Sequence, residues 1–338
     1  MNSHQTTIKD IAKTLGISPS TVSRALKDHP DISVKTKRKV QELAKELKYQ
    51  PNEIALSLKN QRTKVIGIII PEIIHHFFSS IISGISDVAY KNGYNIMITQ
   101  SNESYEREVQ DVHMLISSRA AGVLASVAKT TQDFEHFRRL EQSGIPVVFF
   151  DRVCPEMDTD RVIVDDYRGA YMATEHLLLQ GKKQLIHLGA SQHMLIGQNR
   201  KNGFKDALVG SGFRFEESMF FKCDTFEEGI EMTAKILASG QKVDGIFAVN
   251  DATAIGAMRS VKKAGLRIPE DIAIVGFTNG LISQVTDPGL TTIEQHGFEM
   301  GKSAVELLLR RIKSNNENIK TETVILQPEL VVRESTKS

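Results

Sequence analysis

Hydroxyl and guanidinium groups gather in one short run, Ser18–Arg24, which reads Ser-Pro-Ser-Thr-Val-Ser-Arg. Serine followed by proline is a typical helix start, because the hydroxyl caps the helix and proline fits its first position. An arginine on such a helix can donate two hydrogen bonds to guanine O6 and N7, a contact worth about 1–3 kcal/mol of discrimination. The hydroxyls of Ser18 and Ser23 suit phosphate oxygens, which position a protein on DNA. The run therefore predicts contact with a DNA duplex.

Two further helices are predicted around this run. Thr7 and Asp10 are placed as a capping box, apolar residues follow at helical spacing, and Gly16 ends that first helix. Another helix begins at Ser33 and carries several lysines early on its outer face. Three short helices with a glycine turn between the first two favour a helix-turn-helix, whose second helix enters the major groove. The alternative at this point is a small three-helix bundle with a solvated basic face.

Charge is divided unevenly along the 338 residues, although the net charge of the whole chain is only +1. Residues 1–64 hold 13 Lys and Arg against 6 Asp and Glu (+7), which leaves 42 − 13 = 29 against 41 − 6 = 35 (−6) for the rest. A basic head on a mildly acidic body is typical of a polyanion-binding segment joined to a body with another task.

The cysteine and hydropathy patterns exclude several classes. Cys154 and Cys223 are too few for a disulfide framework and are not spaced as metal ligands, so we expect a reducing compartment, no metal and no cofactor. The first ten residues lack the apolar core of a secretory signal, and no apolar run is long enough to span a membrane. A soluble, cytoplasmic protein without membrane contact is expected.

Short Val- and Ile-rich runs alternate with helical stretches from residue 64 onward. They are VIGIII from Val65, NIMIT from Asn95, GVLAS from Gly122, VVFFD from Val147, QLIHL from Gln184, GIFAV from Gly245 and IAIV from Ile272. Such continuous runs predict parallel strands covered on both faces, here in two successive sets. The predicted fold class is an all-α helix-turn-helix head followed by an α/β body of two Rossmann-like lobes with parallel sheets.

Polar residues follow several of these runs directly, among them Ser126, Asp151, Asn250 and Thr278. In such folds a ligand binds beyond the carboxyl ends of the strands, and two facing lobes place that site in their shared cleft. Carboxylate, amide and guanidinium groups can pair the hydroxyls of a sugar-like ligand while Phe77 or Phe78 packs against its apolar face. For most of these residues, a loop side chain bonded to nearby backbone is an equally good interpretation.

The runs TIKDIAKTLGISPSTVSRAL and DISVKTKRKVQELAKELKYQPNEIALSLK resemble the head of the LacI/GalR family of bacterial repressors. The resemblance implies a short hinge helix after Tyr49, Pro51 and Asn52, with Leu58 as the leucine that enters the minor groove. Two such leucines from a dimer would wedge into one base step, at an unstacking cost of a few kcal/mol. The predicted DNA-contacting residues are Thr7, Ser18, Pro19, Ser20, Thr21, Ser23, Arg24, Asn52, Ala55, Leu58 and Lys59.

The resemblance extends over the body and implies a periplasmic-binding-protein-like fold. It is carried by Asp151-Arg152, Asp165-Asp166, Arg200-x-x-Gly203-Phe204, Asn250-Asp251, Gly276-Phe277, PGLTTIEQ and PELVVRES. The positions that match the family's effector contacts are Phe78, Asp151, Arg200, Asn250, Thr278 and Gln295, which join Phe77 and Ser126 from the strand ends. The chain departs from the family at Thr278-Asn279, where two acids are usual. The missing negative charge, with Arg152 and Arg200 retained, predicts that the site tolerates an anionic effector such as a sugar acid or sugar phosphate, besides a neutral sugar.

Two other classes share parts of this pattern. An enzyme is disfavoured because the chain lacks a dinucleotide-binding glycine motif after Val65–Ile70, a phosphate-binding loop and a nucleophile elbow, so no catalytic residue is assigned. A transporter's solute-binding protein would share the body, but would need a secretion signal and no basic head.

The predicted domains are a helix-turn-helix over 1–50, a hinge over 51–63, a first lobe over 64–164 with 294–323, and a second lobe over 165–293 with 324–338. The predicted partners are a palindromic DNA operator, a small-molecule effector and a second copy of the chain. These expectations describe a sequence-specific transcriptional regulator, most simply a repressor of a carbohydrate-utilisation operon.

Overall fold

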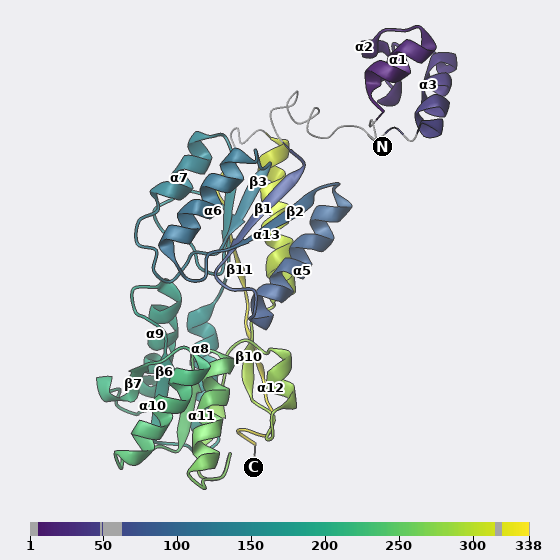
Figure 1. The fold of residues 1–338 in the computed structure, drawn as a ribbon. Helices are drawn as coiled ribbons and strands as arrows, with labels where there is room; N and C mark the ends of the chain where they lie inside the picture. The colour runs from purple at the N-terminus through teal and green to yellow at the C-terminus, as the bar shows by residue number, and fades with distance from the viewer. Residues whose placement is uncertain (1–5, 48, 50–62, 315–319, 338) are drawn as a thin grey trace. The chain divides into compact units, whose positions relative to one another are not determined.

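The computed structural model describes residues 6–47, 49, 63–314 and 320–337. It divides into two compact units, Met1–Thr63 and Lys64–Ser338 (Figure 1). Each unit has its own buried hydrophobic residues. Of the predicted residues, Asn52, Ala55, Leu58 and Lys59 lie outside the described ones.

The first unit contains three helices, α1 (Ile8–Leu15), α2 (Pro19–Leu26) and α3 (Val34–Glu46). The predicted capping box at Thr7 and Asp10 is confirmed, as are the caps at Ser18 and Ser33. Gly16 ends α1 in the left-handed conformation (φ 63°), which glycine adopts without steric cost. The inner faces of the three helices pack around Ile11, Val22 and Val40, whose side chains are fully buried.

The first lobe of the body is built on a parallel six-stranded sheet in the order β11-β5-β4-β3-β1-β2. Helices α5 and α13 cover one face of this sheet, and α6 and α7 cover the other (Figure 1). Close packing of α5 on α13 needs glycine, because a Cβ on Gly84 would lie 2.1 Å from the Phe298 carbonyl oxygen. The strands are β1 (Val65–Ile70), β2 (Asn95–Gln100), β3 (Gly122–Ala125), β4 (Val147–Phe150), β5 (Arg161–Val164) and β11 (Thr323–Leu326); the helices are α5 (His76–Lys91), α6 (Tyr105–Ser117), α7 (Glu135–Gln142) and α13 (Gly297–Lys313).

The second lobe has a parallel four-stranded sheet in the order β7-β6-β8-β9. Helices α8 and α9 pack on one face of this sheet and α10 and α11 on the other, while an antiparallel pair, β10 and β12, lies beside β9. The strands are β6 (Leu185–Gly189), β7 (Phe220–Lys222), β8 (Gly245–Ala248), β9 (Ala273–Val275), β10 (Thr292–Glu294) and β12 (Glu329–Val331); the helices are α8 (Asp166–Leu179), α9 (Leu195–Gly210), η1 (Glu217–Met219), α10 (Phe226–Ala238), α11 (Asp251–Lys263) and α12 (Leu281–Val285).

The chain passes between the lobes three times: from β5 to α8, from β10 to α13 and from β11 to β12. The predicted lobe boundaries need two corrections. Residues 324–326, expected in the second lobe, belong to β11, which pairs with β5 in the first-lobe sheet. Glu294, expected at the start of the first-lobe segment, is the last residue of β10 and pairs with Glu329. An apolar run shows that a strand forms but not which sheet edge it joins, so the sequence pattern misplaced both boundaries.

Candidate functional site

The second helix of the first unit exposes a small polar surface. Pro19, Ser20 and Arg24 are exposed, and Thr21 and Ser23 are half-buried. The Ser18 hydroxyl accepts a hydrogen bond from the Thr21 amide at 3.1 Å, and its oxygen lies 2.7 Å from the Ser20 hydroxyl oxygen. Ser18 therefore holds the start of α2 in place and contributes a polar group to the same surface as Ser20.

Thr7 is exposed and lies at the start of α1. Its hydroxyl donates to the Asp10 carboxylate at 2.7 Å, and the same carboxylate accepts from the Thr7 backbone amide at 2.8 Å. The capping box thus fixes the backbone at the start of α1, where Thr7 is exposed. The caps at Ser18 and Ser33 fix the starts of α2 and α3 in the same way.

Arg200 is the most firmly held of the predicted effector residues. It is 5% exposed, and its Nε and Nη2 donate to one carboxylate oxygen of Asp166 at 2.8 and 2.6 Å. Its Nη1 donates to the Val249 carbonyl, and its guanidinium carbon lies 3.7 Å from the centre of the Phe277 ring. These contacts join α8, α9 and the ends of β8 and β9 at the carboxyl edge of the second-lobe sheet.

Asp151 lies at the corresponding edge of the first-lobe sheet, directly after β4. The Ser126 hydroxyl donates to its carboxylate at 3.4 Å. Burial raises the pKa of Asp151 to about 6, although the positive charge of Arg152 nearby works in the opposite direction. Arg152 donates to both carboxylate oxygens of Glu103, at 2.8 and 2.9 Å. The charges of Arg200 and Asp166, in the second lobe, also affect the pKa of Asp151.

Asn250 caps α11 and uses both ends of its side-chain amide. The oxygen accepts from the Thr253 amide, and the nitrogen donates to the Asp224 carbonyl, each at 2.8 Å. The neighbouring Asp251 holds the next strand-end loop, because its carboxylate accepts from the Gly280 amide at 2.9 Å and from the Thr292 hydroxyl. Burial raises the pKa of Asp251 to about 6. Asn250 and Asp251 are therefore both framework groups of the strand-end region.

Phe77 and Thr278 meet at a cavity of about 270 Å³ that is also lined by His76, Asn279 and His296. Phe78 and Gln295, by contrast, are 4% and 3% exposed. Asn279, where the family usually has an acid, donates to the Glu294 carboxylate at 2.6 Å and accepts from Arg333 at 2.6 Å. The side-chain amide of Asn279 is thus already bound on both sides, by Glu294 and by Arg333.

The sequence interpretation did not assign Asp166, Glu103 or Phe277 to the effector site. Asp166 and Phe277 contact Arg200, which is 34 and 77 positions away along the chain, and Glu103 binds Arg152, which is 49 positions away. Asp166 and Phe277 fall within motifs noted for the family, but nothing in their local sequence marks them as partners of Arg200.

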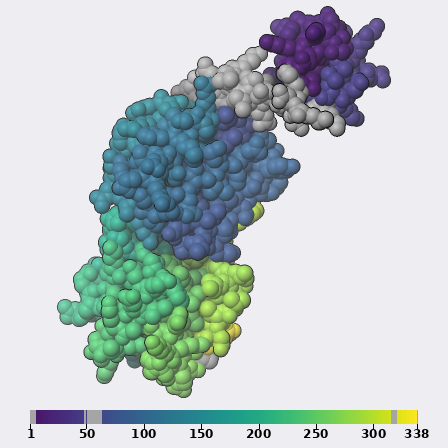
Figure 2. Space-filling view, in the orientation of Figure 1, coloured from purple at the N-terminus to yellow at the C-terminus, as the bar shows by residue number. Residues whose placement is uncertain are grey.

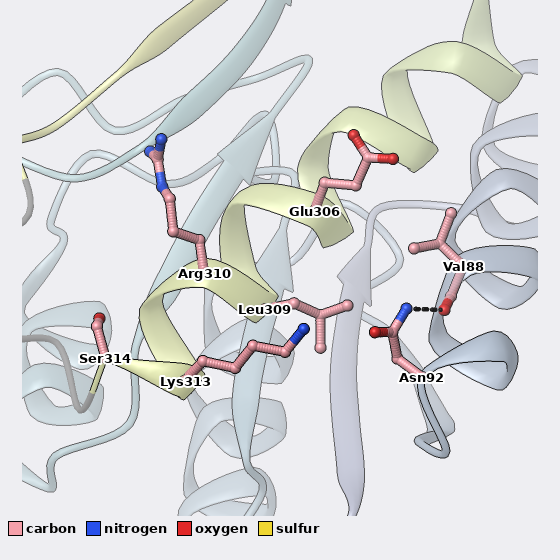
Figure 3. Close-up of a pocket in the computed structure, with 7 residues that line it drawn as sticks. All are labelled: Val88, Asn92, Glu306, Leu309, Arg310, Lys313 and Ser314. Carbon is pink, nitrogen blue, oxygen red and sulfur yellow. Dashed lines mark hydrogen bonds between the residues drawn. The ribbon is translucent and has the colours of Figure 1, made fainter.

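A larger hollow, of about 580 Å³, lies elsewhere on the first lobe, between α5 and α13 (Figure 3). Val88 and Asn92 come from the end of α5, and the other lining residues, among them Leu309 and Lys313, come from the end of α13. Since α5 starts beyond the carboxyl end of β1 and runs back along the sheet, this hollow lies at the amino edge of the strands. It is separate from the strand-end groups described above.

Two family matches cover nearly all of the chain. Residues 7–52 match the bacterial regulatory proteins of the lacI family, and residues 63–333 match the periplasmic binding proteins and sugar-binding domain of the LacI family. The chain belongs to the lacI family of bacterial regulatory proteins. This lacI-family protein is thus a DNA-binding transcriptional repressor with a ligand-binding domain, as the motifs predicted.

Relatives of the lacI-family protein match along its whole length. The HTH-type transcriptional repressor PurR of Vibrio vulnificus is 32% identical over 336 residues, 98% of each chain. The lac repressor dimer bound to operator and the anti-inducer ONPF has a TM-score of 0.86 at 26% identity, covering 98% of this chain and 99% of that one. The transcriptional regulator CelR in complex with cellobiose has a TM-score of 0.75 at 26% identity, with the same coverage.

The described part of the lacI-family protein contains neither a membrane-spanning helix nor a cluster of metal ligands. None of the described helices is long and apolar enough to cross a membrane. No group of three or more His, Cys, Asp or Glu residues is arranged to hold a metal ion there.

Proposed function

We propose that this repressor binds a palindromic operator as a homodimer in the cytoplasm, and that a sugar-like effector bound between its lobes controls operator affinity. The observation that best supports an effector site is that Asp151 directly follows β4, while Arg200 binds the Val249 carbonyl and Asn250 caps α11 at the end of β8. Sheets of this kind bind ligands at the carboxyl ends of their strands. A solved relative bound to cellobiose supports a sugar-like ligand, and a carbohydrate-utilisation operon is the simplest target.

The DNA-binding surface of one head is small, so useful affinity requires two heads on related half-sites. We assign base readout to Arg24, phosphate contacts to Ser18 and Ser23, and the hinge contacts to Asn52, Ala55, Leu58 and Lys59. Thr7, Pro19, Ser20 and Thr21 complete the surface that contacts DNA. An operator-bound dimer is known for the lac repressor, which supports the same arrangement here.

The pairing of the two arginines limits how strongly the site can favour an anionic effector over a neutral one. Arg200 is neutralised by Asp166 and Arg152 by Glu103, so an anionic ligand has to compete with a carboxylate for either one. Thr278 and Asn279 add no negative charge that would repel such a ligand. We therefore assign the site to sugars, sugar acids and sugar phosphates, with Phe77, Phe78, Ser126, Asp151, Arg200, Asn250, Thr278 and Gln295 around it.

The effector acts by binding one lobe arrangement more tightly than another. A change in the angle between the lobes would move the segment that precedes β1 and so favour or disfavour paired hinge helices. A coupling free energy of about 1–3 kcal/mol is typical of such systems.

The proposal is tested in two steps. Fluorescence anisotropy with duplexes selected from a random library should show salt-dependent binding to a palindromic sequence; an absence of sequence preference would contradict operator recognition. A thermal-shift screen of sugars, sugar acids, sugar phosphates and nucleobases should then find a ligand that raises the melting temperature and changes operator affinity. Binding of neutral sugars without binding of their uronates or phosphates would contradict an anionic effector. The Thr278→Asp variant should weaken the binding of an anionic ligand more than the binding of a neutral one.

A further inference from the structure

The loop that follows β3 is fixed to the first lobe by a buried glutamate. Glu108, which is fully buried, accepts hydrogen bonds from the Ala128 amide and the Thr131 hydroxyl, both at 2.7 Å. The ring nitrogen Nε2 of buried His136 lies 2.9 Å from the same carboxylate. The loop is thus held at both sides of Lys129.

A second glutamate holds Lys129 itself. The Glu103 carboxylate accepts from the Lys129 amide at 2.7 Å, and the Glu103 carbonyl accepts from the Thr130 hydroxyl at 2.9 Å. The backbone of Lys129 is therefore fixed, and its side chain and carbonyl are presented from a rigid support.

Both presented groups reach the other lobe. The Lys129 ammonium donates to the Asp224 carboxylate at 3.1 Å, and the Lys129 carbonyl accepts from His193 Nε2 at 2.7 Å. Among the residues that the structure describes, these two are the hydrogen bonds that join the lobes away from the three chain crossings. Figure 2 shows the two lobes, in blue and green, in contact along their boundary.

Lys129 differs from the two arginines of the cleft in how firmly it is held. Arg200 and Arg152 each make at least two hydrogen bonds to a carboxylate within their own lobe. The Lys129 ammonium has one carboxylate partner, and its side chain remains 30% exposed. Opening the contact of its ammonium with Asp224 therefore breaks fewer hydrogen bonds than moving either arginine would.

The contact is also connected to predicted effector groups on both lobes. The Asp224 carbonyl accepts from Asn250, and the Glu103 carboxylate that holds Lys129 also binds Arg152, next to Asp151. A ligand that moves Asn250 or Arg152 would therefore disturb the contact directly.

We propose that Lys129 is a positioning residue that holds the two lobes closed over the effector cleft through its ion pair with Asp224. Closure by this pair does not depend on a ligand, whereas its link to the effector rests on the function proposed above. Removing the ammonium shifts the protein toward an open lobe arrangement, and a guanidinium at the same position keeps it closed.

The test is an electron-spin distance measurement on the full chain without ligand. Spin labels are attached through Glu106→Cys and Glu227→Cys, two exposed positions in the first turns of α6 and α10, whose starts follow strand ends. The native Cys154 and Cys223 are fully buried, and burial raises the pKa of the Cys223 thiol to about 12, so they react slowly with the label. Dilution with unlabelled protein limits the signal to distances within one chain.

Four variants are compared in this background. Lys129→Gln and Asp224→Asn should raise the population at the longer distance roughly two- to fivefold, the range for a partly exposed ion pair. Lys129→Arg should keep the parent distribution, as should Lys91→Gln, which removes the same charge from a surface pair with Asp87. High salt should shift the parent protein but not Lys129→Gln.

Two results would overturn the proposal. One is a parent-like distribution for Lys129→Gln; the other is an equal shift for Lys129→Gln and Lys129→Arg. The distances need neither DNA nor effector, so a failure here is distinct from a failure of operator binding or of the ligand screen.

Discussion

The guanidinium of Arg200 lies over the ring of Phe277, with its central carbon 3.7 Å from the ring centre. The same group is bound by Asp166, so stacking and ion pairing act on one buried cation. An arginine held in this way keeps its orientation before any ligand arrives. Lysine could supply the charge but neither the planar stack nor the forked donors.

Arg200→Ala should lower the free energy of unfolding of the body by about 3–5 kcal/mol, because it leaves the Asp166 carboxylate buried without its partner. Urea denaturation followed by circular dichroism measures this loss. The exposed Arg168 on the neighbouring α8 is the matched control, and Arg168→Ala should change stability by less than about 0.5 kcal/mol. The double variant Asp166→Asn/Arg200→Met should recover part of the loss; if it is as unstable as Arg200→Ala, the unpaired charge is not the cause.

Asp151 should make the protein less stable as the pH rises. Its pKa of about 6 lies above the ordinary value of 3.8, so the folded state binds the proton more tightly than the unfolded state does. The stability that Asp151 contributes is fully present below pH 3.8, decreases between pH 3.8 and about 6, and is lost above about pH 6, a total change of up to about 3 kcal/mol.

Calorimetry on Asp151→Asn tests this dependence. The melting temperature of the variant relative to the parent protein should rise between pH 4.5 and 6 and level off above that, as follows from the pKa of about 6. Burial also raises the pKa of Asp251 to about 6, but Asp251 is present in both proteins, so its effect cancels in the difference between their melting temperatures. Asp271→Asn is the control. Hydrogen bonds from Arg267 lower the pKa of Asp271 to about 2, so the melting-temperature difference between this variant and the parent protein should not change between pH 4.5 and 6. A flat profile for Asp151→Asn would contradict the raised pKa.

Capping and strand cores could be predicted from the sequence because both depend on neighbours. The caps at Thr7, Ser18 and Ser33 each use a residue three positions away, and the buried strands are continuous apolar runs. The contacts that shape the cleft are different in kind. Lys129 and Asp224 are 95 positions apart and meet only after both lobes have folded, so no local pattern could pair them.

Arg24→Lys should weaken binding to the selected operator by about 10- to 100-fold, because lysine keeps the charge but loses the two-donor contact with guanine. Binding to an unrelated duplex should stay within about twofold, since the phosphate attraction is retained. Anisotropy titrations with both duplexes measure the two constants. An equal loss on both would assign Arg24 to the phosphate backbone.

Leu58→Ala should likewise weaken operator binding far more than non-specific binding, because the smaller side chain cannot open the base step. The control is Leu56→Ala, the same truncation two residues earlier, which we expect to have the smaller effect. A circular-permutation bending assay adds a second readout: the Leu58 variant should bend the operator less. Unchanged bending together with equal affinity losses on the two duplexes would argue against the minor-groove role.

The three chain crossings have a consequence for synthesis on the ribosome. The first-lobe sheet gains its edge strand β11 only after residue 326 has been made, and the second lobe gains β12 later still. The first unit needs nothing downstream for its own core. A nascent chain can therefore carry a folded head well before either lobe is complete, so the capacity to touch DNA would emerge before the capacity to be regulated.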